Sequence, residues 1–439
     1  MAPLSILIVG CGIAGPTLAS FLLLSPLAAK EKPHITILER SPALRTQGQN
    51  VDIRGAGMTI IRKLGLESTI RTCLTGEEGA QIVDAQNRVW AEFGVDRTGK
   101  VQTGTSDIEI LRGRLAEICY KRSKSVSEQV VRQGGAGVEY VYGDYLETID
   151  QDGQKVHVTF RNSGEKRSFD LLVGADGLQS RTRNMVWGAE GEDDRVRQLG
   201  LYIGFFSIPS AATDNEWRRW FHAPGRKGIM LRPSEVKDRR TVSMGVINEE
   251  DTRFKEAAAD GRRGMAFQKA LLREYFQNEG WECERLLREM DATSDFYYDM
   301  VAQVRMDKWS KGRVVLLGDA AYCASPISGM GTTLGLNGAY NLAGALLRHP
   351  EDLPAAFSEY EEAMRPTVDR AQKLAPGMPR LIHPETVWGM WVMRAILWTI
   401  WCSGLQLLMF KLAGPPANAV PVVEYGFREL QDTPIDLEK

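Results

Sequence analysis

A glycine-rich turn directly after an apolar run constrains the start of this chain more than any other feature. The run LSILIVG (4–10) is typical of a short buried strand, and GCGIAG follows at 10–15. In such a turn Gly10 permits the tight passage from strand to helix, Gly12 lets the backbone approach a pyrophosphate, and Gly15 allows close packing of helix on sheet. The N-terminus of a helix favours phosphate groups. The spacing therefore predicts a dinucleotide-binding turn.

The residues after this turn continue a βαβ pattern. A helix is expected from Ile13 to about Leu24, and HITILER (34–40) is typical of the next strand. Strands that alternate with helices pair in parallel. Glu39 closes the second strand, at the place where a carboxylate hydrogen-bonds an adenosine ribose. A chance glycine-rich turn is the alternative, and the strand, the helix and Glu39 in register disfavour it.

Two further glycine-centred signatures stand later in the chain. The second is GADGLQSRTR (174–183), and the third is GRVVLLGDAAYCASPISGMG (312–331). In the third, the strand VVLLG delivers Asp319 into a loop, and a glycine-rich segment then starts a helix. Unpaired N–H groups at that start are suited to stabilising an anionic group. For the second signature alone, an ordinary turn rich in Asp and Gly is the alternative.

Together and in this order, the three signatures resemble the FAD-dependent aromatic-hydroxylase family, the single-component flavoprotein monooxygenases built like p-hydroxybenzoate hydroxylase. The resemblance implies an α/β fold: a Rossmann-like FAD-binding domain with a parallel sheet, an inserted antiparallel-sheet substrate domain and a long C-terminal helix. It implies that NADPH or NADH reduces FAD, that the reduced flavin forms a hydroperoxide with O₂, and that one oxygen atom enters a small aromatic, polyketide or other secondary-metabolite substrate. FAD is expected to be non-covalent, and no catalytic side chain is assigned because the flavin carries the chemistry.

The segments 44–66 and 109–115 resemble more narrowly the tetracycline-inactivating branch and its fungal relatives. Asp52 and Arg112 match FAD contacts of that branch, and Arg45 matches a position implicated in NADPH binding; for these arginines a solvated surface charge is the alternative. Asp176 is expected to lie along the FAD and to influence NAD(P)H binding, and Asp319 to bind the ribityl hydroxyls. The complete expected cofactor set is Gly10, Gly12, Gly15, Glu39, Arg40, Arg45, Asp52, Arg112, Asp176, Asp319, Gly329, Met330 and Gly331.

The resemblance also gives an expectation about the substrate. Arg219 falls about where the tetracycline enzymes place a substrate-contacting arginine, whereas Gly204 replaces a polar contact residue there. Tetracycline itself is therefore not the expected physiological substrate.

The pattern of strands and helices predicts two domains and a C-terminal segment. A run of short strands without helices begins at Leu201 and ends at Ile247, which indicates an antiparallel sheet inserted in the first domain. The FAD-binding domain is assigned to 1–76, 106–183 and 290–345, the substrate domain to 77–105 and 184–289, and the C-terminal helical segment to 346–439.

Composition narrows the partners. The chain has 54 basic and 56 acidic residues among 439. It therefore lacks the excess of basic residues that is typical of nucleic-acid-binding proteins. Six scattered cysteines and five histidines show no metal-ligand spacing, so no metal is predicted. The apolar strand at the N-terminus leaves no room for a secretory leader, so a cytoplasmic or peripherally membrane-associated protein is expected. The sequence does not fix the oligomeric state.

The apolar segment 385–414 allows three interpretations. The uncharged residues between Arg394 and Lys411 would span about 24 Å as a helix, less than the ~30 Å hydrocarbon core. A helix that braces the two domains is favoured, an interfacial helix with peripheral membrane contact through 388–411 is the second interpretation, and a true span is the third.

Three other functions are compatible with a glycine turn of this kind. A flavin halogenase would carry a WxWxI-type motif and a disulfide reductase a CxxxxC pair after the first signature, and neither occurs. A non-catalytic FAD-binding redox sensor or interaction protein stays open as the alternative to an enzyme.

Overall fold

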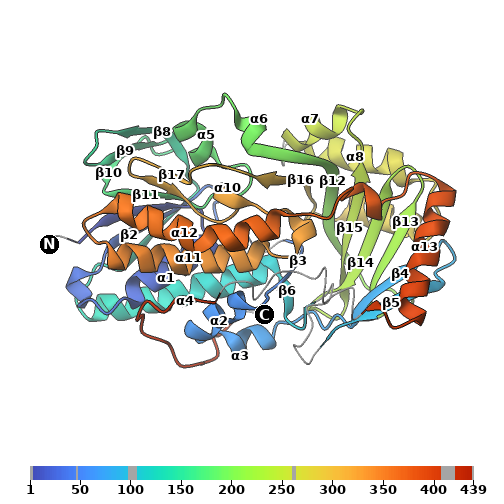
Figure 1. Cartoon of the computed structure of the whole chain (residues 1–439), viewed down its shortest axis with the longest axis horizontal. Helices are drawn as coiled ribbons and strands as arrows, with labels where there is room; N and C mark the ends of the chain where they lie inside the picture. Colours follow the sequence, from blue (N-terminus) through green and yellow to red (C-terminus); the bar gives the residue numbers. More distant parts are fainter. Residues whose placement is uncertain (1–2, 46–47, 97–105, 260–263, 407–420, 438–439) are drawn as a thin grey trace.

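The computed structural model describes residues 3–45, 48–96, 106–259, 264–406 and 421–437. Two large sheets divide it: a six-stranded sheet packed with helices on the left of Figure 1, and a seven-stranded sheet on the right. The α/β class and the presence of a second, largely antiparallel sheet confirm the fold expected from the sequence.

The six-stranded sheet grows from the first βαβ unit. β1 pairs in parallel with β2 and β11, and β7 and β18 extend the sheet in parallel, whereas β17 is antiparallel at one edge. β1 and β2 are apolar nearly throughout because both faces of the sheet are covered. The spatial order is β17 (Ser310–Lys311), β18 (Val314–Leu316), β11 (Leu171–Gly174), β1 (Ser5–Val9), β2 (His34–Glu39) and β7 (Val138–Tyr142).

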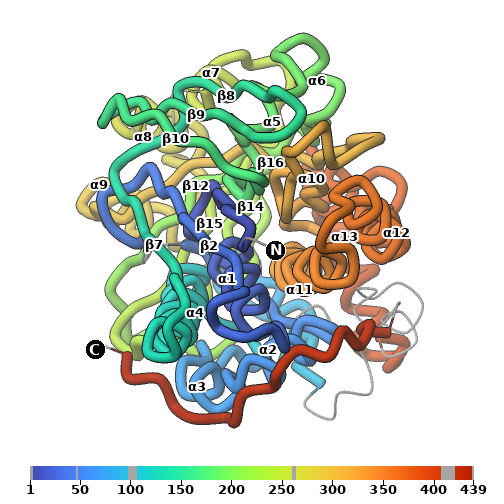
Figure 2. The backbone as a smooth tube through the Cα atoms, turned by 90° about the vertical axis from the view of Figure 1, so that its left-hand side faces the viewer, coloured from blue at the N-terminus to red at the C-terminus, as the bar shows by residue number. Residues whose placement is uncertain are grey.

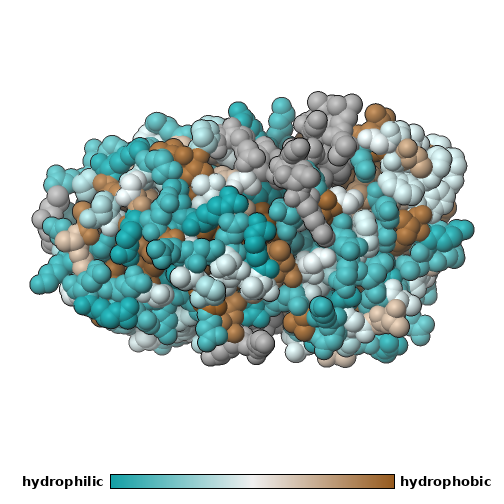
Figure 3. Space-filling view, turned by 90° about the horizontal axis from the view of Figure 1, so that it is seen from below, coloured by the Kyte–Doolittle hydropathy of each residue, from teal (hydrophilic) through white to brown (hydrophobic). Residues whose placement is uncertain are grey.

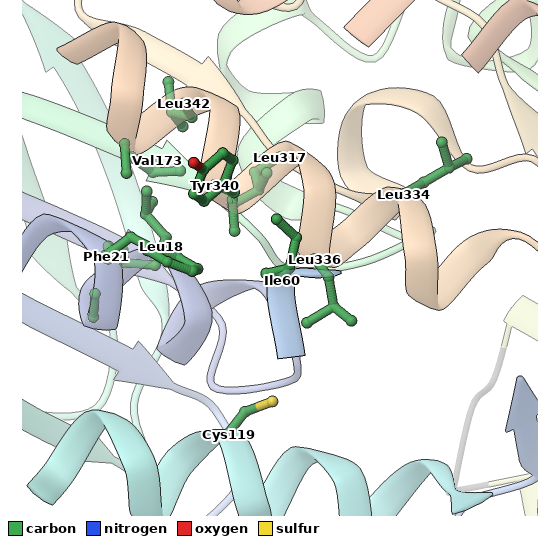
Figure 4. Packing of buried hydrophobic residues seen from close by; sticks show 14 of the residues in the cluster. Leu18, Phe21, Ile60, Cys119, Val173, Leu317, Leu334, Leu336, Tyr340 and Leu342 are labelled. Atoms are coloured by element: carbon green, nitrogen blue, oxygen red, sulfur yellow. The ribbon is translucent and has the colours of Figure 1, made fainter. Parts of the chain in front are cut away.

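Three helices cover one face of this sheet. They are α1 (Ala14–Leu24), α4 (Arg112–Arg132) and α11 (Gly331–Arg348). Figure 4 shows the core that they share, in which the ring of Phe21 in α1 meets the ring of Tyr340 in α11 edge to face at 4.9 Å. Close packing of α1 and α11 brings the N-termini of both helices to the carboxyl ends of the parallel strands.

A separate three-stranded sheet covers the other face, and the sequence patterns did not predict it. Its strands are β8 (Leu146–Gln151), β9 (Val156–Phe160) and β10 (Lys166–Phe169), all antiparallel. Val156, Val158 and Phe160 alternate along β9 and pack against Leu7 and Leu38 of the parallel sheet. The side chains between them face outward, as expected for a strand with one buried face.

The seven-stranded sheet forms the second domain. Its neighbours pair antiparallel except β4 and β13, which are parallel. Three helices, α7 (Arg253–Ala259), α8 (Met265–Phe276) and α9 (Cys283–Ala292), pack on one face, here called the outer face. The spatial order is β16 (Tyr297–Val304), β12 (Val196–Pro209), β15 (Arg239–Ile247), β14 (Lys227–Pro233), β13 (Arg218–Ala223), β4 (Gly79–Val83) and β5 (Val89–Gly94).

The boundary expected at residue 290 needs correction. β16 follows that boundary, yet it pairs with β12 and forms the edge of the seven-stranded sheet. The polypeptide returns to the first domain only after this strand, when it enters β17 and β18. The pairing of β16 with β12 sets the domain boundary, and a single sequence does not show which strands pair.

Polar contacts join the two domains beside the small ribbon of β3 (Asn50–Asp52) and β6 (Glu109–Leu111). The Glu109 carboxylate accepts hydrogen bonds from Asn50 and Thr75, each at 2.7 Å, and forms an ion pair with Arg232 of β14. Thr241 of β15 donates to the side-chain oxygen of Asn50 at 2.6 Å. The face of the large sheet opposite the outer face therefore meets the first domain; it is called the inner face below.

The C-terminal part crosses to the second domain and returns. After α12 (Leu353–Gln372), the chain docks on the hairpin of β13 and β14, where Gly225 N–H donates to the Glu385 carbonyl at 2.7 Å. Helix α13 (Val387–Cys402) then lies against β5 and β13 at the right-hand edge of Figure 1. Among the residues that the structure describes, no helix combines the length and apolar character needed to cross a membrane.

Residues 421–437, called the strap, lie on the helices of the first domain. Figure 2 shows the strap in dark red, passing α2 (Ala56–Lys63) and α3 (Glu67–Arg71) and ending near α4. Lys63 pairs with Glu424 and Glu429 at 2.9 and 2.7 Å, and Ser68 N–H donates to Asp432. The C-terminal segment thus contacts both domains, but through different parts: α13 lies on the second domain and the strap on the first. The bracing role expected for the apolar helix stays a prediction.

The surface in Figure 3 is mostly hydrophilic, with small apolar patches between polar side chains. Scattered apolar side chains of this kind are normal on the surface of a folded protein, and no large apolar patch stands out on this face.

Two buried histidines, one in β13 and one in the C-terminal segment that docks on it, give stability a pH dependence. The rings of His222 and His383 lie 5.7 Å apart, with the Arg394 guanidinium as a further positive neighbour of His222. Burial lowers the pKa of His383 from 6.5 to about 4 and the pKa of His222 well below its usual range. Between those values the unfolded chain binds protons that the folded chain does not, so stability falls as the pH drops below 6.5.

The expected slope is up to about 1.4 kcal/mol per pH unit for each histidine. Urea unfolding of the wild type and of His383→Gln at pH 7, 6 and 5 checks it, with the variant showing the shallower loss. Equal slopes for the two proteins would contradict the assignment.

Candidate active site

The turn between β1 and α1 has the geometry that its glycines predict. A side chain at Gly10, whose φ is +115°, would overlap the carbonyl oxygen of Ala175, and one at Gly15 would overlap the carbonyl oxygen of Gly10. A Cβ at Gly12 would instead lie 3.9 Å from Nη2 of Arg112. No side chain caps the N-terminus of α1. Its first N–H groups therefore face a cradle that a phosphate can occupy.

Glu39 ends β2 beside this cradle. One carboxylate oxygen accepts from the Cys11 N–H at 3.0 Å, and the other accepts from the Ser41 N–H at 2.9 Å. Arg45 Nη2 lies 3.6 Å from the same carboxylate, and Arg40 is exposed directly after the strand. The structure thus brings Glu39, Arg40 and Arg45 to one side of the dinucleotide turn, as a ribose-binding edge requires.

The third signature places Asp319 at the start of the short helix α10 (Asp319–Tyr322). Asp319 is exposed to solvent, yet enclosure by protein atoms raises the pKa of its carboxyl group, with the Arg112 guanidinium acting in the opposite direction. This combination is typical of a group that lines a recess. A Cβ at Gly331, the first residue of α11, would lie 4.0 Å from Oδ1 of Asp319. Asp319 and the N-terminus of α11 therefore share one wall.

The loop before α11 meets the segment after β3. Gly329 has a φ of +61°, and a Cβ there would lie 3.8 Å from Oδ2 of Asp52 and from Nε of Arg54. Arg54 donates to the Asp52 carboxylate at 2.8 Å. Met330, the residue before α11, is fully buried. Side-chain caps are absent from the N-terminus of this described helix, so its N–H groups stay available to a ligand.

Arg112 links the two halves of the recess. Its guanidinium lies beside Gly12 on one side and affects the pKa of Asp319, Asp299 and Tyr297 on the other. Tyr297 donates to the Asp299 carboxylate at 2.9 Å, and burial raises the pKa of both groups. Sequence reasoning missed this pair because no glycine motif marks β16; its proximity to the third signature in the chain was the only signal.

Asp176 of the second signature makes local contacts. Its carboxylate accepts from the Thr182 N–H at 3.0 Å and from the Thr182 hydroxyl at 3.0 Å, at the start of α5 (Arg181–Trp187). Arg183 is fully buried and donates to the Ala320 carbonyl at 2.9 Å. The second signature therefore holds the loop of the third in place, and any contact of Asp176 with FAD stays a prediction.

Arg219 lies apart from the other expected site residues, and its assignment needs correction. It is 2% exposed on the outer face, where it pairs with Asp214 and Glu282 and lies over the Trp281 ring at 5.6 Å. The expectation placed the Arg219 side chain on the substrate side of the sheet, and the structure places it on the opposite face. Successive side chains of a strand point to opposite faces, so an error of one position is enough to cause this. Gly204 also faces outward, since a Cβ there would overlap Leu272.

A parallel sheet with a glycine turn at β1, a ribose-side carboxylate after β2 and an uncapped helix beside Asp319 defines an FAD-binding oxidoreductase fold. The FAD binding domain family model matches residues 4–373. The chain belongs to this family of flavoprotein monooxygenases, and FAD is its cofactor.

Named fungal relatives cover most of the chain. The FAD-dependent monooxygenase asL6 of Sarocladium schorii is 37% identical over 377 residues, 84% of this chain and 86% of the relative. The flavin-dependent monooxygenase eupH of a Phoma species is 34% identical over 446 residues, 97% of this chain and 98% of the relative.

Solved structures show the same fold. Tetracycline destructase Tet(55) superimposes with a TM-score of 0.74 at 28% identity, covering 97% of this chain and 99% of that one. HpxO of Klebsiella pneumoniae, solved with FAD and uric acid, gives a TM-score of 0.68 at 18% identity, covering 94% and 97%.

Proposed function

We propose that the protein is an FAD-dependent monooxygenase that consumes NADPH or NADH and inserts one oxygen atom from O₂ into a small organic secondary metabolite. One observation carries the proposal: residues from all three sequence signatures converge where β1 and β18 end. The residues present fit FAD. The cradle at Gly12 and the uncapped N-terminus of α1 suit phosphate, the carboxylates of Glu39 and Asp319 suit hydroxyl groups, and the uncapped N-terminus of α11 suits the ring.

Different residues would hold different chemical groups of FAD. The N-terminus of α1 and Arg112 hold the pyrophosphate, since a guanidinium fork reaches two oxygens at once. Glu39 holds the adenosine ribose and Asp319 the ribityl hydroxyls, and the N-terminus of α11 stabilises negative charge on the ring. FAD, when bound non-covalently there, supplies the electron transfer and oxygen activation. The inner face of the large sheet positions the substrate and excludes water.

Helix α13 suits a peripheral contact as a secondary role. Met390 is buried, whereas Trp388, Trp391 and Trp398 are 74%, 59% and 49% exposed. Arg394 is half-buried near Asp84, on the protein side of the helix. An exposed aromatic helix face is typical of interfacial helices, and membrane contact here stays a prediction.

Anaerobic mixing of the FAD-loaded protein with NADPH or NADH tests the enzyme against its alternative, the non-catalytic redox sensor or interaction protein. We expect bleaching of the flavin absorbance within seconds to minutes by at least one of the two nucleotides, and re-oxidation when air is admitted. A flavin that neither nucleotide reduces, with or without candidate aromatic substrates, would favour the non-catalytic alternative.

A further inference from the structure

We propose that helix α13 docks on the same helix of a second copy of this chain, and that the two helices pair antiparallel around a twofold axis. The contact surface, called the α13 face, is formed by Trp388, Trp391, Ala395, Trp398 and Cys402. It lies at the outer end of the second domain, away from the domain that carries the dinucleotide turn (Figure 1). The inference is therefore independent of the proposed function.

The exposed side of α13 is apolar and large. Trp388, Trp391 and Trp398 are 74%, 59% and 49% exposed, and Val387 and Ile396 are 68% and 54% exposed. A fully exposed tryptophan presents about 250 Å², so these five side chains leave roughly 650 Å² open to solvent. Two such surfaces would together bury roughly 1,300 Å², which lies within the range of specific protein interfaces. Monomeric proteins rarely expose a continuous apolar patch of this size.

The residues of the α13 face follow the heptad spacing of paired helices. Successive members are separated by three, four, three and four positions along the chain. Uncharged residues at this spacing form the seam along which one helix packs on another. All five are exposed or half-buried, so the seam points away from β5 and β13, on which the helix rests.

Side-chain size selects the antiparallel arrangement. In a twofold pair, a residue that contacts a second residue of the other copy is contacted in the same way in return. With the axis between positions 395 and 398, Ala395 faces Trp398 of the second copy, and Trp391 faces Cys402. Each layer then joins a large side chain to a small one. A parallel pair would set Trp398 against Trp398 and Ala395 against Ala395, so that one layer is overfilled and the next is underfilled.

A groove on the exposed side of the helix is placed to receive the tryptophan of the second copy. It is lined by Trp391, Val392, Ala395, Ile396, Thr399 and Ile400. Four of these residues follow the i, i+3, i+4, i+7 spacing of the hole into which a side chain of a facing helix inserts. The small side chain of Ala395 leaves space in this hole, and the antiparallel register places Trp398 of the second copy directly over it.

The distribution of charge favours a second copy over a lipid surface. Helices that lie in a membrane interface carry Lys and Arg residues on their polar side, and these residues attract anionic headgroups. Helix α13 has one charged residue, Arg394, which is half-buried near Asp84. The α13 face therefore lacks this electrostatic attraction, whereas its sequence of large and small residues is self-complementary. A lipid surface and a second copy would compete for the same face.

Sedimentation velocity of the FAD-loaded full chain at several micromolar concentrations tests the inference. We expect a species with twice the 48.9 kDa mass of the chain. Trp398→Glu places a charge in the seam and should raise the dissociation constant of the dimer at least about thirtyfold, as expected for a tryptophan at the centre of an interface. Val131→Glu is the matched control, because it places the same charge on a similarly exposed apolar residue of α4 and should dimerise like the wild type.

Ala395→Lys combined with Trp398→Glu tests the antiparallel register. In this register the introduced lysine of one copy faces the introduced glutamate of the other, so the double variant should dimerise at least tenfold more tightly than either single variant. A parallel pair would place like charges together and show no recovery. The FAD content and circular dichroism of each variant show that it is folded.

Three results would overturn the inference: a wild type that stays monomeric, a Trp398→Glu variant that dimerises like the wild type, or a double variant no tighter than the single variants. Flotation with phosphatidylcholine vesicles tests the other occupant of the face. Vesicle binding by a monomeric wild type that Trp398→Glu abolishes would assign the α13 face to lipid, and it would also overturn the inference.

Discussion

Asp319→Ala should lose most of its FAD during dialysis, with a dissociation constant about 10- to 150-fold above that of the wild type. Hydrogen bonds between a charged carboxylate and hydroxyl groups contribute about 1.5 to 3 kcal/mol, and 1.4 kcal/mol corresponds to tenfold in affinity. Asp319 is exposed on the wall of the recess, so its removal should leave the apoprotein folded. Fluorescence titration of apoprotein with FAD measures the constant.

Two further variants make the Asp319 result specific. Asp319→Asn retains the shape and one acceptor, so its affinity should fall between those of the wild type and Asp319→Ala. Asp307→Ala removes an exposed aspartate between β16 and β17 and should bind FAD like the wild type. Wild-type affinity in Asp319→Ala would show that the third signature does not hold the ribityl chain.

Tyr425→Ala should lower the free energy of unfolding by about 3 kcal/mol or more and detach the strap from the first domain. The Tyr425 ring fills the space where a side chain at Gly344 would otherwise stand, and its hydroxyl donates to Asn341 at 3.0 Å. The Arg348 guanidinium lies 4.4 Å from the ring centre. Truncation of a large buried aromatic costs about 3 to 5 kcal/mol. Urea unfolding measures the loss.

Tyr425→Phe separates the packing of the ring from its hydrogen bond. It keeps the ring in contact with Gly344 and removes the hydroxyl, so the expected loss is about 1 kcal/mol. Limited proteolysis should cleave near the C-terminus in Tyr425→Ala well before it does so in Tyr425→Phe. Equal stability of Tyr425→Ala and the wild type would mean that the strap does not stabilise the first domain.

Local sequence chemistry predicted the cofactor half of the molecule well. The turn at Gly10 to Gly15 and the loop at Asp319 depend on backbone conformation within a few residues, so their geometry is readable from spacing alone. The structure brings Arg112 close to Gly12 and Asp319. The FAD contact that the family resemblance implied for Arg112 stays a prediction.

The parts that depend on long-range pairing could not be predicted. Arg219 sits on the outer face because side chains alternate along β13, and a shift of one residue reverses the face. Asp299 and Tyr297 join the site only because β16 pairs with β12 across about ninety residues. The strap docks on α1, α2 and α11. The sequence of 421–437 has no periodic pattern that predicts these contacts.

Oxygen-18 gas tests the central claim most directly. The FAD-loaded protein is incubated with NADPH and a panel of hydroxylated fused-ring compounds under labelled oxygen. The masses of the products are then measured by mass spectrometry. The proposed monooxygenase function predicts a product that contains one oxygen-18 atom, formed with consumption of one NADPH. NADPH consumption that yields only hydrogen peroxide with every compound, or a product whose new oxygen atom carries no label because it derives from water, would contradict it.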